Sequence, residues 1–330
     1  MSKTPSRRAV VAALGGFAGA AGLATGKARA QAEWPTRTIT IVHGFPAGGP
    51  SDVIARLVAA GLQKAFGQSV IVEPRPGASG TTAAAFVARA APDGYTLMVI
   101  PSGFASAAAT FAHLPYNSVT DFTTISLVST YPYVMCTNAA SGIKTVAELI
   151  AAATARPGRL LYGTPGVGSG PQLAIELCAQ KTTIKVQHVP FRGSEPAVTE
   201  LVAGRLDFMM DPPASLIGFV RAGKLNALAV SSAHRYFALP DTPTVAESGV
   251  PGFDVTAWQG LIAPAGLPDP ILTRLNVELG NLLKAPATID KLHGFGNEPE
   301  PTTPEDFKKR LVADIATWTA LADEIHFQKI

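Results

Sequence analysis

Short apolar runs alternate with helical patterns along most of the chain, and this alternation restricts the fold more than any other feature. Runs such as Arg37–His43, Tyr95–Ile100 and Leu160–Gly163 are bounded by turn residues and are predicted to be strands. Between them, the apolar spacing of segments such as Val53–Phe66 predicts amphipathic helices. Such alternation is typical of mainly parallel sheets with helices on both faces, so we expect an α/β protein.

The chain is long enough for two such domains. It has 330 residues, of which 47% are hydrophobic and 15% charged, a composition that supplies two buried cores and excludes a disordered protein. The predicted strands outnumber those of one small sheet. A C-terminal portion that returns to complete the first domain would need two crossings, and segments Leu127–Thr137 and Asp254–Ala263 are the candidates.

Residues 1–30 have the layout of a secretory signal peptide. Ser6-Arg7-Arg8 gives a basic start, and the apolar run Ala9–Leu23 is shorter than the roughly 20 residues of a spanning helix. Small residues offer cleavage near Ala30 or Ala32. We therefore expect export to the periplasm through the Sec or the twin-arginine route, with a retained anchor as the alternative.

This segment also carries the positive charge of the chain. Removal of its five basic residues changes the net charge from +3 to −2, so a nucleic-acid partner is not expected. The six histidines are scattered, no metal-ligand spacing is present, and no metal or cofactor is expected. Cys136 and Cys178 are the two cysteines, and either a disulfide or two buried thiols fits an oxidising compartment.

Three predicted strands end in loops of small residues, and each loop opens a helix. The loops are 45–52, 164–170 and 190–194. Glycines allow a ligand to approach the backbone, and a helix start presents unpaired N–H groups and a positive dipole end. Each loop can therefore bind a carboxylate or a phosphate, although loops of this composition also occur as ordinary turns.

Several side chains in these loops allow two interpretations. Asp52 is a cap of the first helix, which we favour, or it fixes the glycine loop. Arg192 pairs with a ligand carboxylate or is a solvated surface residue. Phe45 and Phe191 line the apolar body of a ligand or belong to the core. Asp211 caps the helix that follows it, or it contacts the ligand or the hinge.

The motifs of enzymes fit less well. The glycine-rich sequence around Ser169 matches neither a nucleophile elbow nor a phosphate-binding loop. A secreted hydrolase that uses Ser169 or Ser51 remains the alternative, and it requires a histidine within hydrogen-bond reach of the serine. We therefore expect a binding protein rather than an enzyme.

The order of short motifs resembles the tripartite tricarboxylate transporter receptors, also called Bug-type proteins. The resemblance runs from Trp34 to the C-terminus and rests on the combination of segments 34–35, 45–52, 75–78, 92–97, 162–169, 189–193, 223–230, 239–249 and 263–266. It implies a type II periplasmic-binding-protein fold, in which two α/β domains enclose a ligand cleft and are joined by two crossing strands. The implied domains are residues 31–133 with 256–330, and residues 134–255.

The resemblance also implies a function. Such a receptor is a monomer that captures a small organic acid and delivers it to an inner-membrane permease; a sensor that docks on a signalling kinase is the alternative. The implied ligand contacts are Phe45, Ala47, Gly48, Gly49, Asp52, Thr164, Gly166, Ser169, Phe191, Arg192, Gly193 and Asp211. Departures from the family pattern at His43-Gly44, Pro74, Gln172 and Phe191-Arg192 leave the identity of the solute open.

Overall fold

The computed structural model describes residues 34–330, so the predicted signal peptide lies outside the described residues. The chain divides into two units, Met1–Thr36 and Arg37–Ile330, and the second contains every helix and strand described below. Within the described part of the chain, helices that combine the length and the apolar character needed to cross a membrane are absent.

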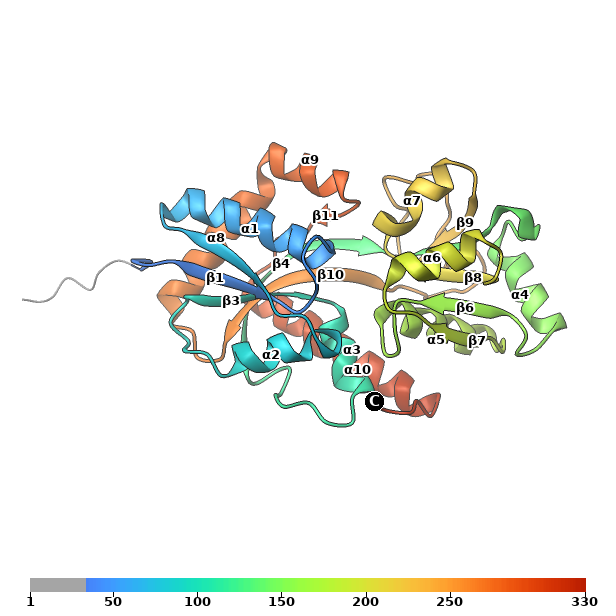
Figure 1. Cartoon of the computed structure of the whole chain (residues 1–330), viewed down its shortest axis with the longest axis horizontal. Helices are drawn as coiled ribbons and strands as arrows, with labels where there is room; N and C mark the ends of the chain where they lie inside the picture. The colour runs from blue at the N-terminus through green and yellow to red at the C-terminus, as the bar shows by residue number, and fades with distance from the viewer. Residues whose placement is uncertain (1–33) are drawn as a thin grey trace, which may run out of the picture. The chain divides into compact units, whose positions relative to one another are not determined.

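The first sheet has six strands in the order β11-β4-β10-β3-β1-β2 (Figure 1). Their bounds are β1 Ile39–His43, β2 Val70–Pro74, β3 Thr96–Pro101, β4 Phe122–Pro132, β10 Thr256–Pro264 and β11 Glu298–Pro299. Strand β1 is parallel to β2 and β3, whereas β10 is antiparallel to β3 and β4. The expected mainly parallel sheet is therefore a mixed sheet, because β4 and β10 run opposite to the strands beside them.

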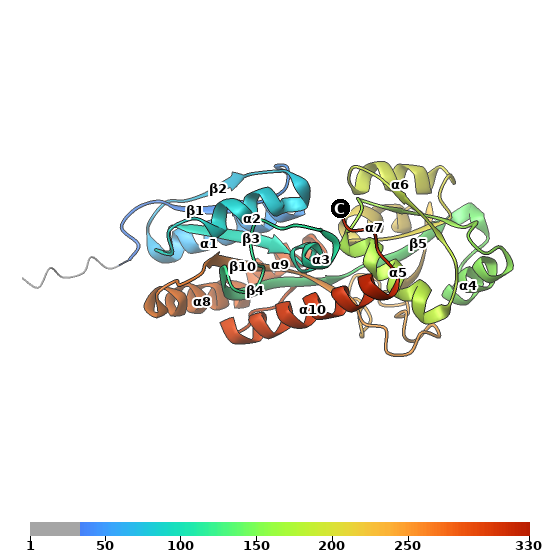
Figure 2. The ribbon, with the colours of Figure 1, turned by 90° about the horizontal axis from the view of Figure 1, so that it is seen from below.

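Helices cover both faces of this sheet. Helices α1 (Pro50–Phe66) and α8 (Asp269–Lys284) pack together on one face, and α9 (Pro286–Gly294) follows them. Helices α2 (Thr81–Ala88), α3 (Gly103–Thr110) and α10 (Pro304–Glu324) lie on the other face (Figures 1 and 2). Among these elements, α3, α9 and β11 were not predicted from the sequence.

The second sheet has five strands in the order β7-β6-β8-β5-β9. Their bounds are β5 Val134–Asn138, β6 Leu161–Thr164, β7 Gln187–Pro190, β8 Phe208–Asp211 and β9 Leu225–Val230. Strand β6 is parallel to β7 and β8, and β5 is antiparallel to β8 and β9. The helices of this sheet are α4 (Val146–Ala155), α5 (Gly170–Thr182), α6 (Ser194–Val202) and α7 (Pro213–Arg221).

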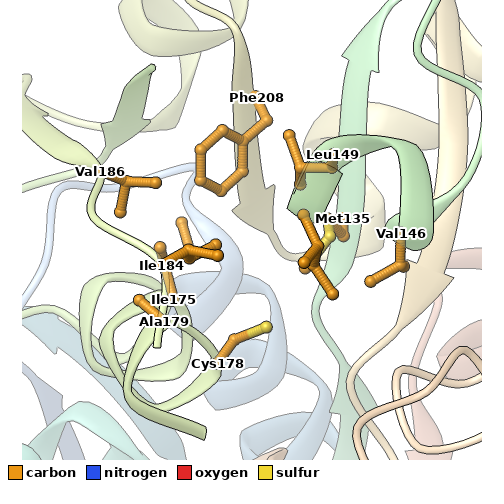
Figure 3. A pocket seen from close by; sticks show the side chains of 10 residues that line it. Met135, Val146, Leu149, Ile175, Cys178, Ala179, Ile184, Val186 and Phe208 are labelled. Carbon is orange, nitrogen blue, oxygen red and sulfur yellow. The ribbon is translucent and has the colours of Figure 1, made fainter. Parts of the chain in front are cut away.

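The core of the second sheet is divided between its two faces. Met135 of β5 packs with the residues of α4 and α5, whereas Cys136 packs with those of α6 and α7. Cys178 of α5 belongs to the first of these clusters, so the sheet separates the two buried, free thiols. Beside Cys178 lies a cavity of about 10 Å³, which has room for about one water molecule. Figure 3 shows the apolar side chains that line it.

The chain passes between the two sheets twice, as predicted. It leaves the first sheet at the end of β4, and Tyr133 alone separates β4 from β5 of the second sheet. It leaves the second sheet after β9 and returns to the first as β10. The structure is therefore a two-domain α/β fold in which the C-terminal elements complete the first sheet, because β10 and β11 pair on either side of β4.

Candidate functional site

The loop between β1 and α1 is held in place by the buried carboxylate of Asp52. Oδ2 of Asp52 accepts hydrogen bonds from the backbone N–H of Gly48, at 3.0 Å, and from Nε of Arg56, at 2.8 Å. Oδ1 accepts from Nε2 of His43 at 3.0 Å. The favoured interpretation of Asp52 as a helix cap is wrong, since Gly49 is the N-terminal cap residue of α1 and no side chain caps it. Asp52 instead fixes the glycine loop.

The charges around Asp52 favour its ionised form. The hydrogen bond from Arg56 is the largest cause, and with those from Gly48 and His43 it lowers the pKa of Asp52 to about 2. Burial lowers the pKa of His43, so the neutral imidazole is favoured. The Nδ1 atom of His43 is buried and has no hydrogen-bond partner. The carboxylate is thus compensated by Arg56 and remains negative across the physiological pH range.

The same loop packs tightly against its own domain. A Cβ atom on Gly44 would lie 2.3 Å from Cα of Gly80, so this approach requires glycine. Phe45 is half-buried, and its ring lies next to Gly80. Ala47 and Gly48 are exposed, and Gly48 has a φ of +83°, a left-handed conformation that favours glycine. The backbone of the loop tip is therefore accessible at the start of α1 (Figure 1).

The second predicted loop joins β6 to α5. Thr164 is buried, and its Oγ1 lies 3.0 Å from the carbonyl oxygen of Gly166 and 2.6 Å from Nε2 of His188. Ser169 is the N-terminal cap of α5, and its Oγ accepts from the backbone N–H of Gln172 at 3.4 Å. The side chain of Gln172 in turn accepts from the N–H of Gly168 at 2.7 Å. Ser169 and Thr164 therefore shape the loop.

The third predicted loop, between β7 and α6, is tied to the second. The N–H of Phe191 donates to the carbonyl of Thr164 at 2.9 Å, and the N–H of Gly193 donates to that of Pro165 at 3.1 Å. Phe191 is half-buried, and its ring lies next to Gly163. Arg192 is exposed, and the described residues offer it neither a hydrogen bond nor an ion pair. Its guanidinium group is available to a ligand.

Asp211, the last residue of β8, is fully buried at the start of two helices. Its Oδ2 accepts from Oγ of Ser215 in α7, and the hydroxyl group of Ser194 at the start of α6 lies close enough to favour the ionised form of this carboxyl group. Its Oδ1 is buried and has no partner. The prediction that Asp211 caps the next helix is wrong, because Pro212 occupies the cap position of α7 and no side chain caps it. Burial raises the pKa of Asp211 to about 6.

The predicted residues thus form two groups, one on each sheet. Phe45, Gly48 and Asp52 lie at the carboxyl end of β1, whereas the 164–170 and 190–194 loops and Asp211 lie at the carboxyl ends of β6, β7 and β8. In α/β folds, ligands bind at these strand ends. Contacts bring the second group against the first sheet through α3: Oγ of Ser106 donates to the carbonyl of Gly168 at 3.1 Å.

Helix α3 was missed because its alanine-rich sequence has no amphipathic period. Its contact with the second loop is close, since a Cβ atom on Gly168 would lie 2.7 Å from Oγ1 of Thr110. The chain also places Ser102 at the carboxyl end of β3, directly before α3. The sequence did contain a sign of a helix start at this point, because Ser102-Gly103 follows a predicted strand just as the three glycine loops do.

Neither serine of the hydrolase alternative has the geometry of a nucleophile. Among the described residues, His43 bonds to Asp52 and His188 to Thr164, so neither imidazole bonds to Ser51 or Ser169. Ser169 Oγ instead accepts a backbone hydrogen bond, and Ser51 is buried in α1. The described residues also contain no cluster of three or more metal-ligating side chains. The arrangement offers backbone donors and the unpaired guanidinium group of Arg192 rather than a nucleophile and its base.

Comparisons with known proteins relate the chain to one family of transporter receptors. A family model described as the tripartite tricarboxylate transporter family receptor matches residues 54–327. A protein in the tcbD-tcbE intergenic region of Pseudomonas sp. strain P51 is 35% identical over 96% of this chain and 94% of its own length. Protein BugT of Bordetella pertussis is 32% identical over 96% of this chain and 97% of its own.

Solved structures show the same similarity. Rpa4515 of R. palustris, solved with adipate, is 34% identical, with a TM-score of 0.82 and coverage of 90% of this chain and 100% of its own. MatC from Rhodopseudomonas palustris, with bound malate, is 34% identical, with a TM-score of 0.77 and coverage of 87% and 99%. The periplasmic binding protein BugD has 29% identity, a TM-score of 0.78 and coverage of 90% and 100%. On this evidence the chain belongs to the tripartite tricarboxylate transporter family of receptors, as the order of its sequence motifs implied.

Proposed function

We propose that this protein is a periplasmic receptor that captures a small carboxylated solute and delivers it to an inner-membrane permease. The observation that carries the proposal is the set of accessible glycine loops at helix starts on both sheets, in a chain whose relatives were solved with adipate and with malate. A helix start offers unpaired N–H groups and a positive dipole end, which suit a carboxylate.

The two domains would be residues 31–133 with 256–330, and residues 134–255. The two sheets support this division, since β5 to β9 form one sheet and the remaining strands form the other. The connections at Tyr133 and at residues 231–255 would act as the hinge. Closure would then shift an equilibrium between open and closed forms, in proportion to the preference of the solute for the closed form.

Each predicted contact except Asp211 would have a definite part in binding. The exposed tip of the first loop would offer the backbone of Ala47, Gly48 and Gly49, with Asp52 holding the tip in place. In the second domain, Gly166, Ser169, Gly193 and the guanidinium group of Arg192 would meet the other end of the solute, with Thr164 supporting the loop. The half-buried rings of Phe45 and Phe191 would border its carbon chain.

Export, oligomeric state and partner complete the proposal. The secretory pattern of residues 1–30 and the periplasmic relatives support a location in the periplasm. We expect a monomer that binds no nucleic acid and needs no cofactor. Its partner would be the permease of a tripartite tricarboxylate-type transporter, as the family description implies.

A thermal-shift or calorimetric screen of organic acids tests the binding function. A ligand at 100 times its dissociation constant should add about 2.7 kcal/mol to the free energy of unfolding. Gly48→Val should abolish this gain, because a β-branched side chain at a φ of +83° displaces the loop tip.

Gly67→Val is the matched control. Gly67 has a φ of +67° and, like Gly48, has no other atom within 4 Å of the position of an added Cβ. It follows the opposite end of the 17-residue helix α1, about 25 Å away along the axis. The control should lose similar intrinsic stability and keep the ligand-induced gain. Equal binding by both variants would refute the assignment of the first loop.

A further inference from the structure

The carboxyl group of Asp211 is a buried acid that the proposed backbone contacts leave unexplained. It is 0% exposed, it precedes the start of α7, and it interacts with Ser194 at the start of α6. Ser194 and Ser215 satisfy part of the group, but Oδ1 has no partner. A buried carboxylate with an unsatisfied oxygen is unfavourable unless the group is protonated or a donor reaches it.

Among residues 34–330, the side chains that interact with Asp211 carry no positive charge. The titratable groups that interact with it are Tyr131 of β4, Tyr133 of the β4–β5 connection and Cys136 of β5. Burial raises the pKa of all three, so they are neutral near pH 7. Helices α6 and α7 contribute the serine hydroxyl groups. Asp211 therefore differs from Asp52, whose charge is compensated by Arg56.

The charged side chains of the third loop do not pair with Asp211. Arg192 and Glu195 flank Ser194 in the sequence, and both are exposed without a hydrogen bond to Asp211. An anion bound at the start of α6 would thus share that helix end with the Asp211 carboxylate. Two carboxylates at one buried site do not both stay ionised, and one of them takes a proton.

We propose that capture of a dicarboxylate by this receptor is coupled to the uptake of one proton from solvent at Asp211. This inference rests on the proposed function, because it requires a solute carboxylate at the start of α6. The solute would enter fully ionised, the proton would go to the unpartnered Oδ1 atom of Asp211, and the resulting carboxylic acid would be a hydrogen-bond donor facing the bound anion.

The electrostatics of the free protein support this coupling. With a pKa of about 6, Asp211 is mostly ionised at pH 7 in the absence of solute. A proton taken up on binding makes the affinity fall with rising pH, at a limiting rate of about tenfold per pH unit. The structure thus points to a receptor that holds its solute more tightly in mildly acidic medium.

Isothermal titration calorimetry measures the coupling directly. Adipate and malate serve as probes at pH 7 and pH 8, where their carboxyl groups are ionised, in pairs of buffers with different ionisation enthalpies. The dependence of the heat on the buffer gives the number of protons taken up. We expect about one proton per bound probe at pH 7 and an affinity that weakens three- to tenfold, roughly, between pH 7 and pH 8.

Asp211→Asn identifies the group that takes the proton. The amide keeps the size of the side chain and resembles the protonated acid, so the variant should bind without proton uptake and with an affinity that is independent of pH. Asp241→Asn is the control, since Asp241 is exposed in the same domain. It should behave like the wild type.

The outcomes separate this inference from the proposed function. If no organic acid binds to the wild type, the proposed function fails. If adipate or malate binds with no proton uptake and no pH dependence, the receptor function stands and the coupling is refuted. Uptake that persists in Asp211→Asn would place the proton on another group, such as His188, and would also refute the assignment. The wild-type measurement decides the coupling even if the variant fails to fold.

Discussion

Replacement of Asp52 by Asn should destabilise the protein and loosen the first glycine loop. The carboxylate is 4% exposed and accepts hydrogen bonds from Gly48, Arg56 and His43. Asn keeps one acceptor oxygen but loses the negative charge. Its NH₂ group is a donor, and it would face side-chain and backbone groups that also donate. The loss should therefore appear both in the free energy of unfolding and in the affinity for the solute.

The pKa of Asp52 sets the size of the effect. The group titrates at about 2 in the folded protein and near 3.8 when unfolded. At 1.36 kcal/mol per pKa unit this corresponds to about 2.4 kcal/mol at pH 7. Arg56 is 58% exposed, so solvent screening reduces the expected loss to about 1–2 kcal/mol. Because the folded pKa is lowered, the contribution is complete above pH 3.8 and disappears as the pH falls through 2.

Urea unfolding of the wild type and the variant at pH 7 and pH 3 measures this loss. The difference should shrink to about half at pH 3, where Asp52 is partly protonated in the unfolded reference. Asp93→Asn is the matched control, since Asp93 pairs with Arg37 at 2.9 Å but both side chains are exposed, at 41% and 62%. Its loss should stay below about 1 kcal/mol. Equal losses in the two variants, or a difference for Asp52→Asn that does not change with pH, would refute the argument.

Three further predictions concern buried groups of the second domain. Burial raises the pKa of Asp211 from 3.8 to about 6, so the wild type loses stability as the pH rises through 6. Asp211→Asn lacks this loss. Between pH 5 and pH 8 its free energy of unfolding, measured with urea, should therefore rise by about 1.4 kcal/mol relative to that of the wild type. Burial lowers the pKa of His188 from 6.5 to about 4, so the wild type loses stability as the pH falls below 6.5. His188→Gln should remove about 2 kcal/mol of this loss at pH 4.5. Acid unfolding followed by circular dichroism measures the difference. Gly168→Ala places a Cβ atom 2.7 Å from Oγ1 of Thr110 at a φ of +74° and should lower the free energy of unfolding by about 2–3 kcal/mol. Gly142→Ala has a φ of +77° but open space around the new Cβ atom, and it should cost about 1 kcal/mol. Thermal unfolding of both variants measures the two costs, and equal costs would contradict the close approach.

Local patterns determined much of this protein. Alternating apolar runs predicted the strands of both sheets except β11. The sequence Thr145-Val146-Ala147-Glu148 is that of a capping box, and the structure forms it, with Glu148 N–H donating to Thr145 Oγ1 at 3.1 Å. These features are set within a few residues, by side-chain period and by hydrogen bonds to nearby backbone groups. The order of the motifs also implied the family, which the comparisons confirm.

Tertiary structure decided what depends on distant partners. Helix α3 has no amphipathic period because its alanines pack on several sides, against α10 and β3. The roles of Asp52 and Asp211 were mistaken because each lies one turn or less from a helix start, where a cap is the local expectation. Whether such a carboxylate caps a helix, holds a loop or lies unsatisfied depends on side chains such as His43 and Ser194, which only the fold brings to it. The pair of Asp52 with Arg56 is local by comparison, because the two residues lie four positions apart in α1.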